Sequence, residues 1–324
     1  MNFHLRLQEE KEKGALPSSL IETVAELFES YVEAAKQNNV DTDISHPIFN
    51  QYLDLVTQEV NEKTPFHSFH EKVIAPFDYF KFGIDFIRPV VRVEESQIFG
   101  DSYLDEINDE IVKGNNVILM ANHQSELDPQ AMALLLQENY PILLRSLIFV
   151  AGHRVTNDPL AIPFSLGCNL LCIYSKHYIE HPIEKRHEKI LHNSRSMRAL
   201  RKLLDEGGKC IYVAPSGGRD RFQDGMLLPR PFDPQSVEVF NFLSNHAKKK
   251  TTLYPFALYT HYLSPPPETI QKELGEKRKI SNTELHLAFG KPFEKTKIVK
   301  QMRDEVARKM WQRVFDLYQT IHKE

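Results

Sequence analysis

The chain has 324 residues, of which 41% are hydrophobic and 26% are charged, and its net charge is −4. This composition is typical of a soluble globular protein with one large domain or two ordinary ones. The three cysteines are odd in number and form no metal-ligand array, which argues against a disulfide framework and favours a reducing compartment. The longest uncharged run, 159–175, is shorter than the roughly 20 apolar residues that span a bilayer, so the sequence predicts no transmembrane segment.

The first residues show neither a secretory signal nor a transit-peptide composition. We therefore expect the protein to work where it is made, in a bacterial-type cytoplasm. A plastid stroma, after removal of a transit peptide, also fits. Peripheral contact with a membrane surface stays open, because a helix lying on a surface needs no long apolar run.

About the first 75 residues are predicted to be helical. Ser19 and Glu22 fit a capping box, and apolar residues from Val24 to Tyr31 follow at helical spacing. A second helix is expected over 47–60.

Beyond this region, short apolar runs alternate with helical patterns. Predicted strands cover 117–121, 147–151, 170–174, 210–214, 253–259 and 285–289. Predicted helices cover 101–113, 129–137, 184–206, 236–247 and 298–321. The alternation predicts an α/β domain over 79–324, with a mostly parallel mixed sheet flanked by helices, preceded by a small helical domain over 1–78. In such sheets ligands gather where strands end and helices begin.

The most informative motif follows the predicted strand 117–121. His123 and Asp128 stand five residues apart, so they can meet only if His123 lies in the turn before the helix begins. Asp128 followed by Pro129 fits a helix N-cap, which places a carboxylate at the positive end of the helix. An imidazole held by a carboxylate can act as a general base near neutral pH. Taken alone, the pair also fits a purely structural role, as a helix cap and a satisfied buried histidine.

A second candidate site lies in the turn after the predicted strand 210–214. Ser216 and Gly217 begin a glycine turn that lets backbone N–H groups approach a ligand, and Arg219 and Arg221 can offer planar guanidinium groups to a phosphate. The segment matches neither a P-loop nor a G-x-G-x-x-G turn, and Ser216 lacks the preceding glycine of G-x-S-x-G. For this segment alone, a glycine turn flanked by surface arginines remains the alternative.

Taken together, several segments resemble the glycerolipid acyltransferases with an H-x-x-x-x-D motif, and most closely the soluble plastid-type glycerol-3-phosphate acyltransferases. The resemblance extends over nearly the whole chain. The segments that carry it are 70–90, 122–129, 149–155, 158–159, 163–165, 169–170, 174–176, 214–221, 231–233 and 265–267.

The resemblance implies transfer of a fatty acyl group from a thioester of acyl carrier protein, or of coenzyme A, to the sn-1 hydroxyl of glycerol 3-phosphate. It implies no metal, no other cofactor and no nucleic-acid partner. His123 and Asp128 would be the catalytic pair, and Arg219 and Arg221 would bind the phosphate.

Lys176 and His177 would complete the phosphate site. Here the chain departs from the family pattern Ser-Lys-Lys-His, because it has one lysine where the pattern has two. Which of Lys176 and His177 contacts the phosphate therefore stays open.

Acyl carrier protein is acidic, and the basic cluster over 185–202 is a candidate docking surface for it. Two alternatives remain. The first is an acyltransferase of the same chemistry whose acceptor is 1-acylglycerol 3-phosphate. A non-catalytic protein would bind anionic lipid or acyl carrier protein through the basic face.

Overall fold

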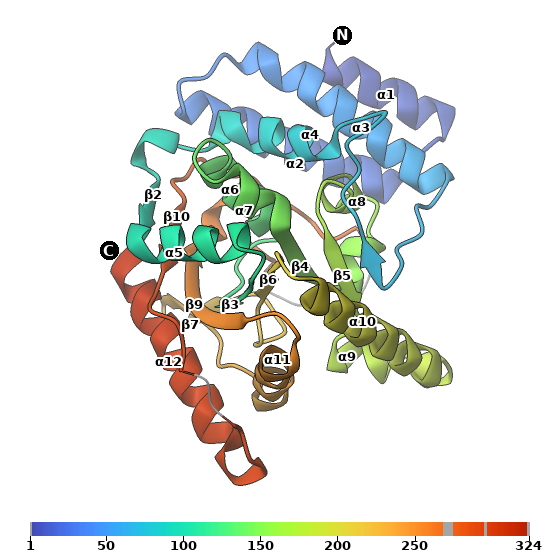
Figure 1. The fold of residues 1–324 in the computed structure, drawn as a ribbon. Helices are drawn as coiled ribbons and strands as arrows, with labels where there is room; N and C mark the ends of the chain where they lie inside the picture. The colour runs from blue at the N-terminus through green and yellow to red at the C-terminus, as the bar shows by residue number, and fades with distance from the viewer. Residues whose placement is uncertain (1, 268–274, 295–296, 323–324) are drawn as a thin grey trace.

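The computed structural model describes residues 2–267, 275–294 and 297–322 (Figure 1). Its helices are α1 (Phe3–Lys13), α2 (Ser18–Gln37), α3 (Ser45–Asn61), α4 (Tyr79–Ile87), α5 (Asp101–Val112), α6 (Asp128–Leu136), α7 (Pro141–Ser146), α8 (Ile162–Ser165), α9 (Lys176–Ile179), α10 (Arg186–Glu206), α11 (Pro234–His246) and α12 (Arg303–Ile321). Its strands are β1 (Phe69–His70), β2 (Gln97–Phe99), β3 (Asn116–Ala121), β4 (Leu147–Gly152), β5 (Leu170–Ile173), β6 (Cys210–Val213), β7 (Arg221–Gln223), β8 (Met226–Leu228), β9 (Thr251–Tyr259) and β10 (His286–Phe289).

An eight-stranded sheet organises the described chain, with the order β1-β5-β4-β6-β3-β9-β10-β2. Its five central strands, from β5 to β9, are parallel to one another. Strand β10 is antiparallel to β9, and β1 is antiparallel to β5. The predicted α/β class with a mostly parallel mixed sheet is thus confirmed. Because the parallel strands run the same way, the turns that follow β3, β5, β6 and β9 gather at one edge of the sheet.

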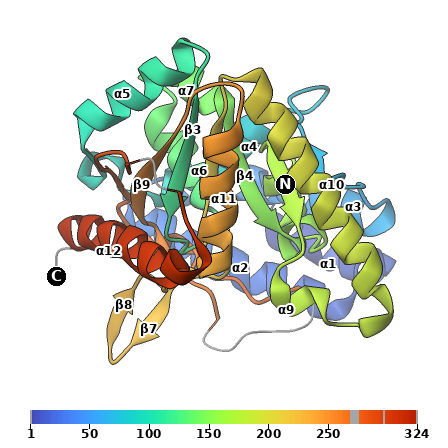
Figure 2. The ribbon, with the colours of Figure 1, turned by 60° about the horizontal axis from the view of Figure 1, so that its bottom comes forward.

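Alternate residues of the central strand β3 supply two cores. Val117, Leu119 and Ala121 point into a core that continues through α1 to α6 and α8, whereas Ile118 and Met120 point into a core formed with α10, α11 and α12. Both sets are buried, as expected for a parallel strand covered on both faces. Figure 2 shows α11 in front of the sheet, with α10 and α12 to either side.

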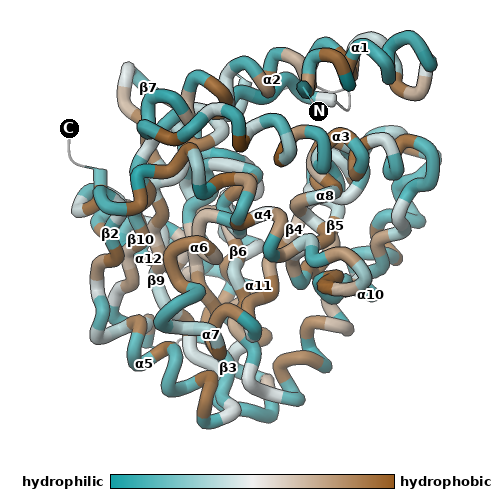
Figure 3. The backbone as a smooth tube through the Cα atoms, turned by 90° about the horizontal axis from the view of Figure 1, so that it is seen from above, coloured by the Kyte–Doolittle hydropathy of each residue, from teal (hydrophilic) through white to brown (hydrophobic). Residues whose placement is uncertain are grey.

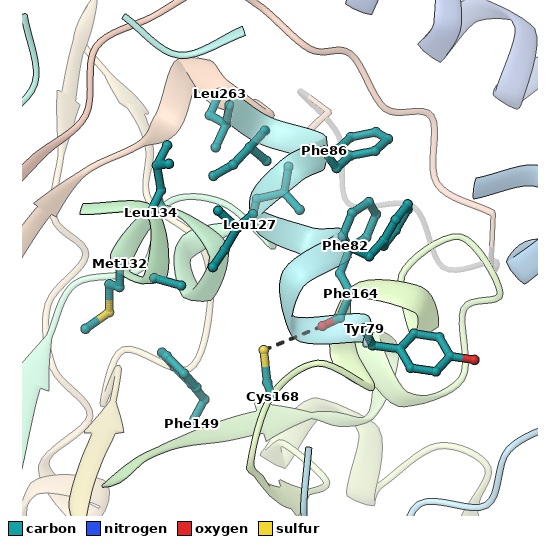
Figure 4. Close-up of a cluster of buried hydrophobic side chains, with 14 of the residues drawn as sticks. Tyr79, Phe82, Phe86, Leu127, Met132, Leu134, Phe149, Phe164, Cys168 and Leu263 are labelled. Atoms are coloured by element: carbon teal, nitrogen blue, oxygen red, sulfur yellow. Dashed lines mark hydrogen bonds between the residues drawn. The ribbon is translucent and has the colours of Figure 1, made fainter. Parts of the chain in front are cut away.

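The amino-terminal helices pack directly on the rest of the protein through aromatic side chains. The ring centroids of Tyr52 and Phe164 lie 5.6 Å apart, and those of Phe49 and Phe86 lie 5.4 Å apart. The hydroxyl of Tyr31 donates a hydrogen bond to the carbonyl of Phe86 at 2.8 Å. Helices α1 to α3 therefore share a continuous core with α4 and α8, while the division at residue 78 stays a prediction about how the chain is organised. Figure 4 shows Phe82, Phe86 and Phe164 of this core beside Leu127.

The capping box predicted at Ser19 and Glu22 is wrong. Helix α2 begins at Ser18 with Pro17 in the cap position, and no side chain caps it. Ser19 lies inside the helix, where its carbonyl accepts a hydrogen bond from the hydroxyl of Thr23.

Helix α6 carries the end of the predicted catalytic motif into the core. Seven of its nine residues are buried, and it is drawn largely in brown in Figure 3. It packs on α4, so its first turn has little freedom to move. None of the helices described is both long enough and apolar enough to cross a membrane.

Candidate active site

His123 and Asp128 meet in the turn between β3 and α6. The Nδ1 atom of His123 lies 2.8 Å from Oδ2 of Asp128. The Asp128 side chain is 2% exposed and the His123 side chain is 32% exposed. The imidazole therefore contacts a buried carboxylate on one side and is partly open to solvent on the other. With Nδ1 engaged by the carboxylate, Nε2 is the ring atom that can meet a substrate.

The sequence predicted that Asp128 caps its own helix, and this prediction is wrong. Leu127 holds the cap position of α6, and Asp128 accepts hydrogen bonds from the backbone N–H groups of Gln124 at 3.1 Å and Ser125 at 2.9 Å. The hydroxyl of Thr260, at the end of β9, donates a third hydrogen bond at 2.6 Å. The carboxylate therefore holds the His123 turn through hydrogen bonds to its backbone and fixes the position of the imidazole.

The turn after β6 is joined to the His123 turn through Asp220. The side-chain amide of Asn122 donates to Asp220 at 2.9 Å, and the backbone N–H of Asp220 donates to the carbonyl of His123 at 2.6 Å. Burial raises the pKa of Asp220 to about 7, although the hydrogen bonds from the Arg230 backbone and from Asn122 act to lower it. The two motifs predicted from separate parts of the sequence thus form one site.

The arginines of the second motif lie in a cluster of positive charge. One guanidinium nitrogen of Arg219 lies 2.6 Å from a carboxylate oxygen of Glu276, and Arg154 lies 2.6 Å from the other oxygen. The pKa of Arg221 is lowered, first by burial and then by the nearby charges of Arg219, Arg230 and Arg154. A single buried carboxylate is thus surrounded by several guanidinium groups, an arrangement with spare positive charge for an anionic ligand.

The glycine turn itself is closed by local interactions. Gly217 has a φ of 69°, a left-handed conformation that glycine adopts without strain. The hydroxyl of Ser216 donates to the carbonyl of Gly218 at 3.1 Å. A Cβ atom on Gly218 would lie 2.5 Å from the Arg230 guanidinium, so a larger residue there would displace the end of that side chain.

Lys176 reaches the same turn from the end of β5. Its Nζ lies 2.8 Å from Oδ1 of Asp233, and the Asp233 backbone N–H donates to the carbonyl of Pro215 at 3.1 Å. The side chain of His177 lies outside what the structure describes. The structure therefore links Lys176 to the arginine-bearing turn, and the choice between Lys176 and His177 as a phosphate contact stays open.

An apolar pocket of about 620 Å³, a volume that includes space open to solvent, lies beside the candidate catalytic pair, and His123 and Tyr212 form part of its wall. Most of the remaining wall is apolar: Phe149, Val150, Ala151, Val155, Ala161, Phe164 and Leu170. Figure 4 shows Phe149, Phe164 and Cys168 at this side of α6. A smaller cavity of about 350 Å³ shares Phe149 and Cys168 with it. A potential base thus stands between an apolar cavity and a cationic cluster.

Several residues of the site are not identified by the sequence patterns. Gln124 and Thr260 orient the His123 turn. Thr260 directly follows the predicted strand 253–259 and Gln124 lies three residues after the predicted strand 117–121, so the position near a strand end is a signal that could have found them. Arg278 is bidentate to Glu126 of the catalytic turn and lies 3.1 Å from Asp158. It comes from an irregular segment with no periodic pattern. No group of three or more His, Cys, Asp or Glu side chains able to hold a metal ion occurs within 2–267, 275–294 and 297–322.

Comparisons with known proteins support an acyltransferase relationship. A family profile named Acyltransferase matches residues 104–259. The chain is 38% identical over 280 residues to a protein of Carthamus tinctorius named glycerol-3-phosphate acyltransferase, chloroplastic, covering 85% of this chain and 60% of that one. It is 34% identical over 327 residues to a protein of the same name from Pisum sativum, covering 97% and 71%.

The chain thus spans about 60% of the length of the Carthamus protein. A crystal structure of a 1-acyl-sn-glycerophosphate acyltransferase from Thermotoga maritima aligns over 74% of this chain and 77% of that one. The TM-score of that alignment is 0.40 and the identity is 17%, a likeness too slight to bear on the fold or the reaction.

Proposed function

Because the chain belongs to the family of the chloroplastic glycerol-3-phosphate acyltransferases, we propose that it transfers a fatty acyl group from a thioester to the sn-1 hydroxyl of glycerol 3-phosphate. The observation that carries the proposal is the contact between His123 and Asp128, 2.8 Å long, at the junction of an apolar cavity and an arginine cluster. These are the three features that the reaction needs: a base, a place for an acyl chain and a place for a phosphate.

His123 acts as the general base. Asp128 holds Nδ1, so Nε2 takes the proton from the C1 hydroxyl as its oxygen attacks the thioester carbonyl. The new C–O bond forms a tetrahedral intermediate, which collapses by breaking the C–S bond and releasing the thiol. A thiol has a pKa of about 8.5, so it leaves readily and can recover the proton from the imidazolium. No covalent acyl-enzyme is required.

The cationic cluster binds the phosphate. Arg219 and Arg221 lie on the turn that Asp220 ties to the His123 carbonyl, so phosphate bound there is held at a fixed distance from the base. Holding the acceptor in this way replaces a bimolecular encounter by a reaction within one complex. Lys176, ion-paired to Asp233 beside the same turn, is positioned to contribute a further cation.

Replacing Arg219 with glutamine is expected to raise the KM for glycerol 3-phosphate about 10- to 100-fold, because a hydrogen bond between charged groups is lost. The change in kcat should be small, since the base and the acyl cavity are untouched. Initial rates at varied glycerol 3-phosphate measure both constants. Arg308→Gln, at an exposed position of α12, is the matched control. An unchanged KM in Arg219→Gln would remove this residue from the phosphate site.

The apolar cavity beside His123 receives the acyl chain. Its wall is formed by β4, the segment leading into α8, and the first turn of α6, and it reaches the catalytic pair directly. Apolar surface removed from water stabilises a bound chain in proportion to the area buried. The thioester carbonyl would then lie at the mouth of the cavity, next to His123.

Acyl carrier protein is the proposed donor, docked on a basic face of α10. Arg195, Arg198, Arg201 and Lys202 are exposed on this helix. The amino-terminal half of α10 contacts the end of β5, where the side chain of Asn193 hydrogen-bonds the backbone of Tyr174. The basic face thus begins two residues beyond the contact with Tyr174 and runs along α10 toward the start of β3, where the Leu204 carbonyl accepts a hydrogen bond from Asn116.

For the carrier-bound donor, we expect kcat/KM to fall steeply as ionic strength rises, because salt screens attraction between exposed charges. Arg198→Glu should lower this kcat/KM several-fold, whereas the value with acyl-coenzyme A should change little. Arg308→Glu, an exposed arginine on α12, supplies a matched control. Weak salt dependence with the carrier-bound donor would count against docking on α10.

We also propose that the protein works in a plastid. The relatives above are named chloroplastic, which favours the stroma over the bacterial-type cytoplasm expected from the start of the sequence. Immunodetection of the native protein in purified chloroplasts and in the remaining cell fractions tests the location.

Thiol release by the purified protein tests the function itself. The assay compares acyl carrier protein thioester and coenzyme A thioester, each with and without glycerol 3-phosphate. Release that depends on glycerol 3-phosphate is expected, with 1-acylglycerol 3-phosphate as the product. Release only with 1-acylglycerol 3-phosphate as acceptor would favour the alternative acyltransferase, and no release with any acceptor would leave a binding protein.

A further inference from the structure

His261 is a buried histidine whose ring is incompletely satisfied. It follows β9 by two residues, and only 4% of its surface is exposed. Its Nδ1 atom has no hydrogen-bond partner among the residues that the structure describes. Buried polar side-chain atoms are paired in the large majority of cases, so an unpaired ring nitrogen beside the candidate site is a candidate contact for a ligand.

The backbone at His261 is fixed to the catalytic turn. The neighbouring Thr260 hydroxyl donates to Asp128 at 2.6 Å. The backbone N–H groups of Thr260 and His261 both donate to the side-chain oxygen of Gln124, at 2.8 Å and 3.2 Å. The position of the imidazole is therefore set by the same residues that set the catalytic pair.

The ring itself contacts the strand that carries the candidate phosphate ligands. The ring centroids of His261 and Phe222 lie 5.4 Å apart in an edge-to-face arrangement, and Phe222 directly follows Arg221 in β7. The imidazole thus joins two parts of the site, the turn that holds Asp128 and the strand that begins with Arg221.

The ring is uncharged at neutral pH. Burial, together with the nearby charges of Arg221 and Arg219, lowers the pKa of His261 to about 4, although Asp128 acts in the opposite direction. A neutral imidazole offers one N–H donor and one acceptor nitrogen, which suits an alcohol better than a phosphate already surrounded by guanidinium groups.

We propose that Nδ1 of His261 hydrogen-bonds the C2 hydroxyl of glycerol 3-phosphate and so makes the enzyme specific for an acceptor with a secondary alcohol. This inference rests on the proposed function. The C1 hydroxyl must reach His123 and the phosphate must reach the arginines, so the C2 hydroxyl lies between them. His261 is linked to both sides, to Asp128 through the neighbouring Thr260 and to the Arg221 strand through Phe222. A site built to bind a hydroxyl discriminates strongly against an acceptor that lacks it, because the site's own polar group is then left unpaired.

The test compares glycerol 3-phosphate with 3-hydroxypropyl phosphate, which lacks only the C2 hydroxyl. The quantity measured is the ratio of kcat/KM for the two acceptors, with acyl-coenzyme A as donor and thiol release as the assay. The wild-type enzyme should prefer glycerol 3-phosphate about tenfold or more. In His261→Leu the ratio should fall to near one, mainly through loss of activity on glycerol 3-phosphate. The control is His246→Leu, an exposed histidine at the end of α11, which should keep the wild-type ratio.

His261→Asn provides a second variant in case the leucine variant does not fold. The asparagine amide lies near the position of Nδ1, so this variant should keep an intermediate ratio of kcat/KM for the two acceptors. Equal losses on both acceptors, with the ratio unchanged, would mean that His261 only supports the fold and would overturn the inference. A wild-type ratio near one would also overturn it. Absence of transfer to either acceptor would instead reject the proposed function, so the two failures are distinguishable.

Discussion

In His123→Ala, kcat for acyl transfer to glycerol 3-phosphate should fall about 10³-fold, while the Kd for glycerol 3-phosphate stays close to the wild-type value. The reason is that the proposed base and the proposed phosphate ligands lie on two different turns. The proposed base lies on the β3–α6 turn, whereas the arginines proposed to bind the phosphate lie on the turn after β6. Removing the imidazole deletes the proton acceptor and leaves the phosphate ligands in place.

Two measurements check this result. Thiol release gives kcat, and isothermal titration calorimetry with glycerol 3-phosphate alone gives Kd without any turnover. His246→Ala, which removes an exposed histidine, should behave as wild type in both. Weakened binding together with an undiminished kcat would contradict the role of His123 as base.

A second large effect is expected at Arg278, which should be essential for stability. Its side chain is 7% exposed and is held by Glu126 and Asp158, whose side chains are 13% and 2% exposed. Burial alone would lower the pKa of Arg278, but the two carboxylates outweigh it and keep the pKa well above its ordinary value. Arg278→Met would leave two carboxylates without their cation, and we expect the free energy of unfolding to fall by about 3–5 kcal/mol.

Urea denaturation followed by circular dichroism measures the loss. Arg186→Met is the matched control, because Arg186 pairs with Glu180 at 3.0 Å while both side chains are half exposed. Its cost should be below about 1 kcal/mol. Adding Glu126→Gln and Asp158→Asn to Arg278→Met should recover part of the loss. A single-variant loss as small as that of Arg186→Met would show that the buried cation is dispensable.

The sheet was largely predictable because parallel strands that are covered on both faces read as short apolar runs. Strands β3 and β9 match their predicted ranges to within two residues at each end. Helix α4, from Tyr79 to Ile87, was missed because its nine residues make fewer than three turns, although Lys81 and Asp85 mark a polar side on a mainly apolar helix. Strands β1 and β2 were missed because two or three residues are too few to show an alternating pattern.

The catalytic site was predictable only in part. The meeting of His123 with Asp128 follows from spacing and the position of the helix start. The hydrogen bonds of Asp128 could not be predicted from the spacing. A carboxylate at a helix start can accept hydrogen bonds from its own helix or from the preceding turn, and the conformation of that turn decides between them. The pairing of Arg219 with Glu276 was also out of reach, since the two residues are 57 positions apart and Glu276 lies in no regular element.

One hydrogen bond links the catalytic turn to the far end of the chain. Gln124, the residue after His123, donates its side-chain amide to the hydroxyl of Tyr318 in α12 at 3.1 Å, across 194 positions of sequence. During synthesis on the ribosome, at about 5–20 residues per second, the His123 turn leaves the exit tunnel well before α12 has been made. The nascent chain would therefore carry the base in an incompletely supported turn. Acyl transfer should begin only after α12 has emerged and docked on β9.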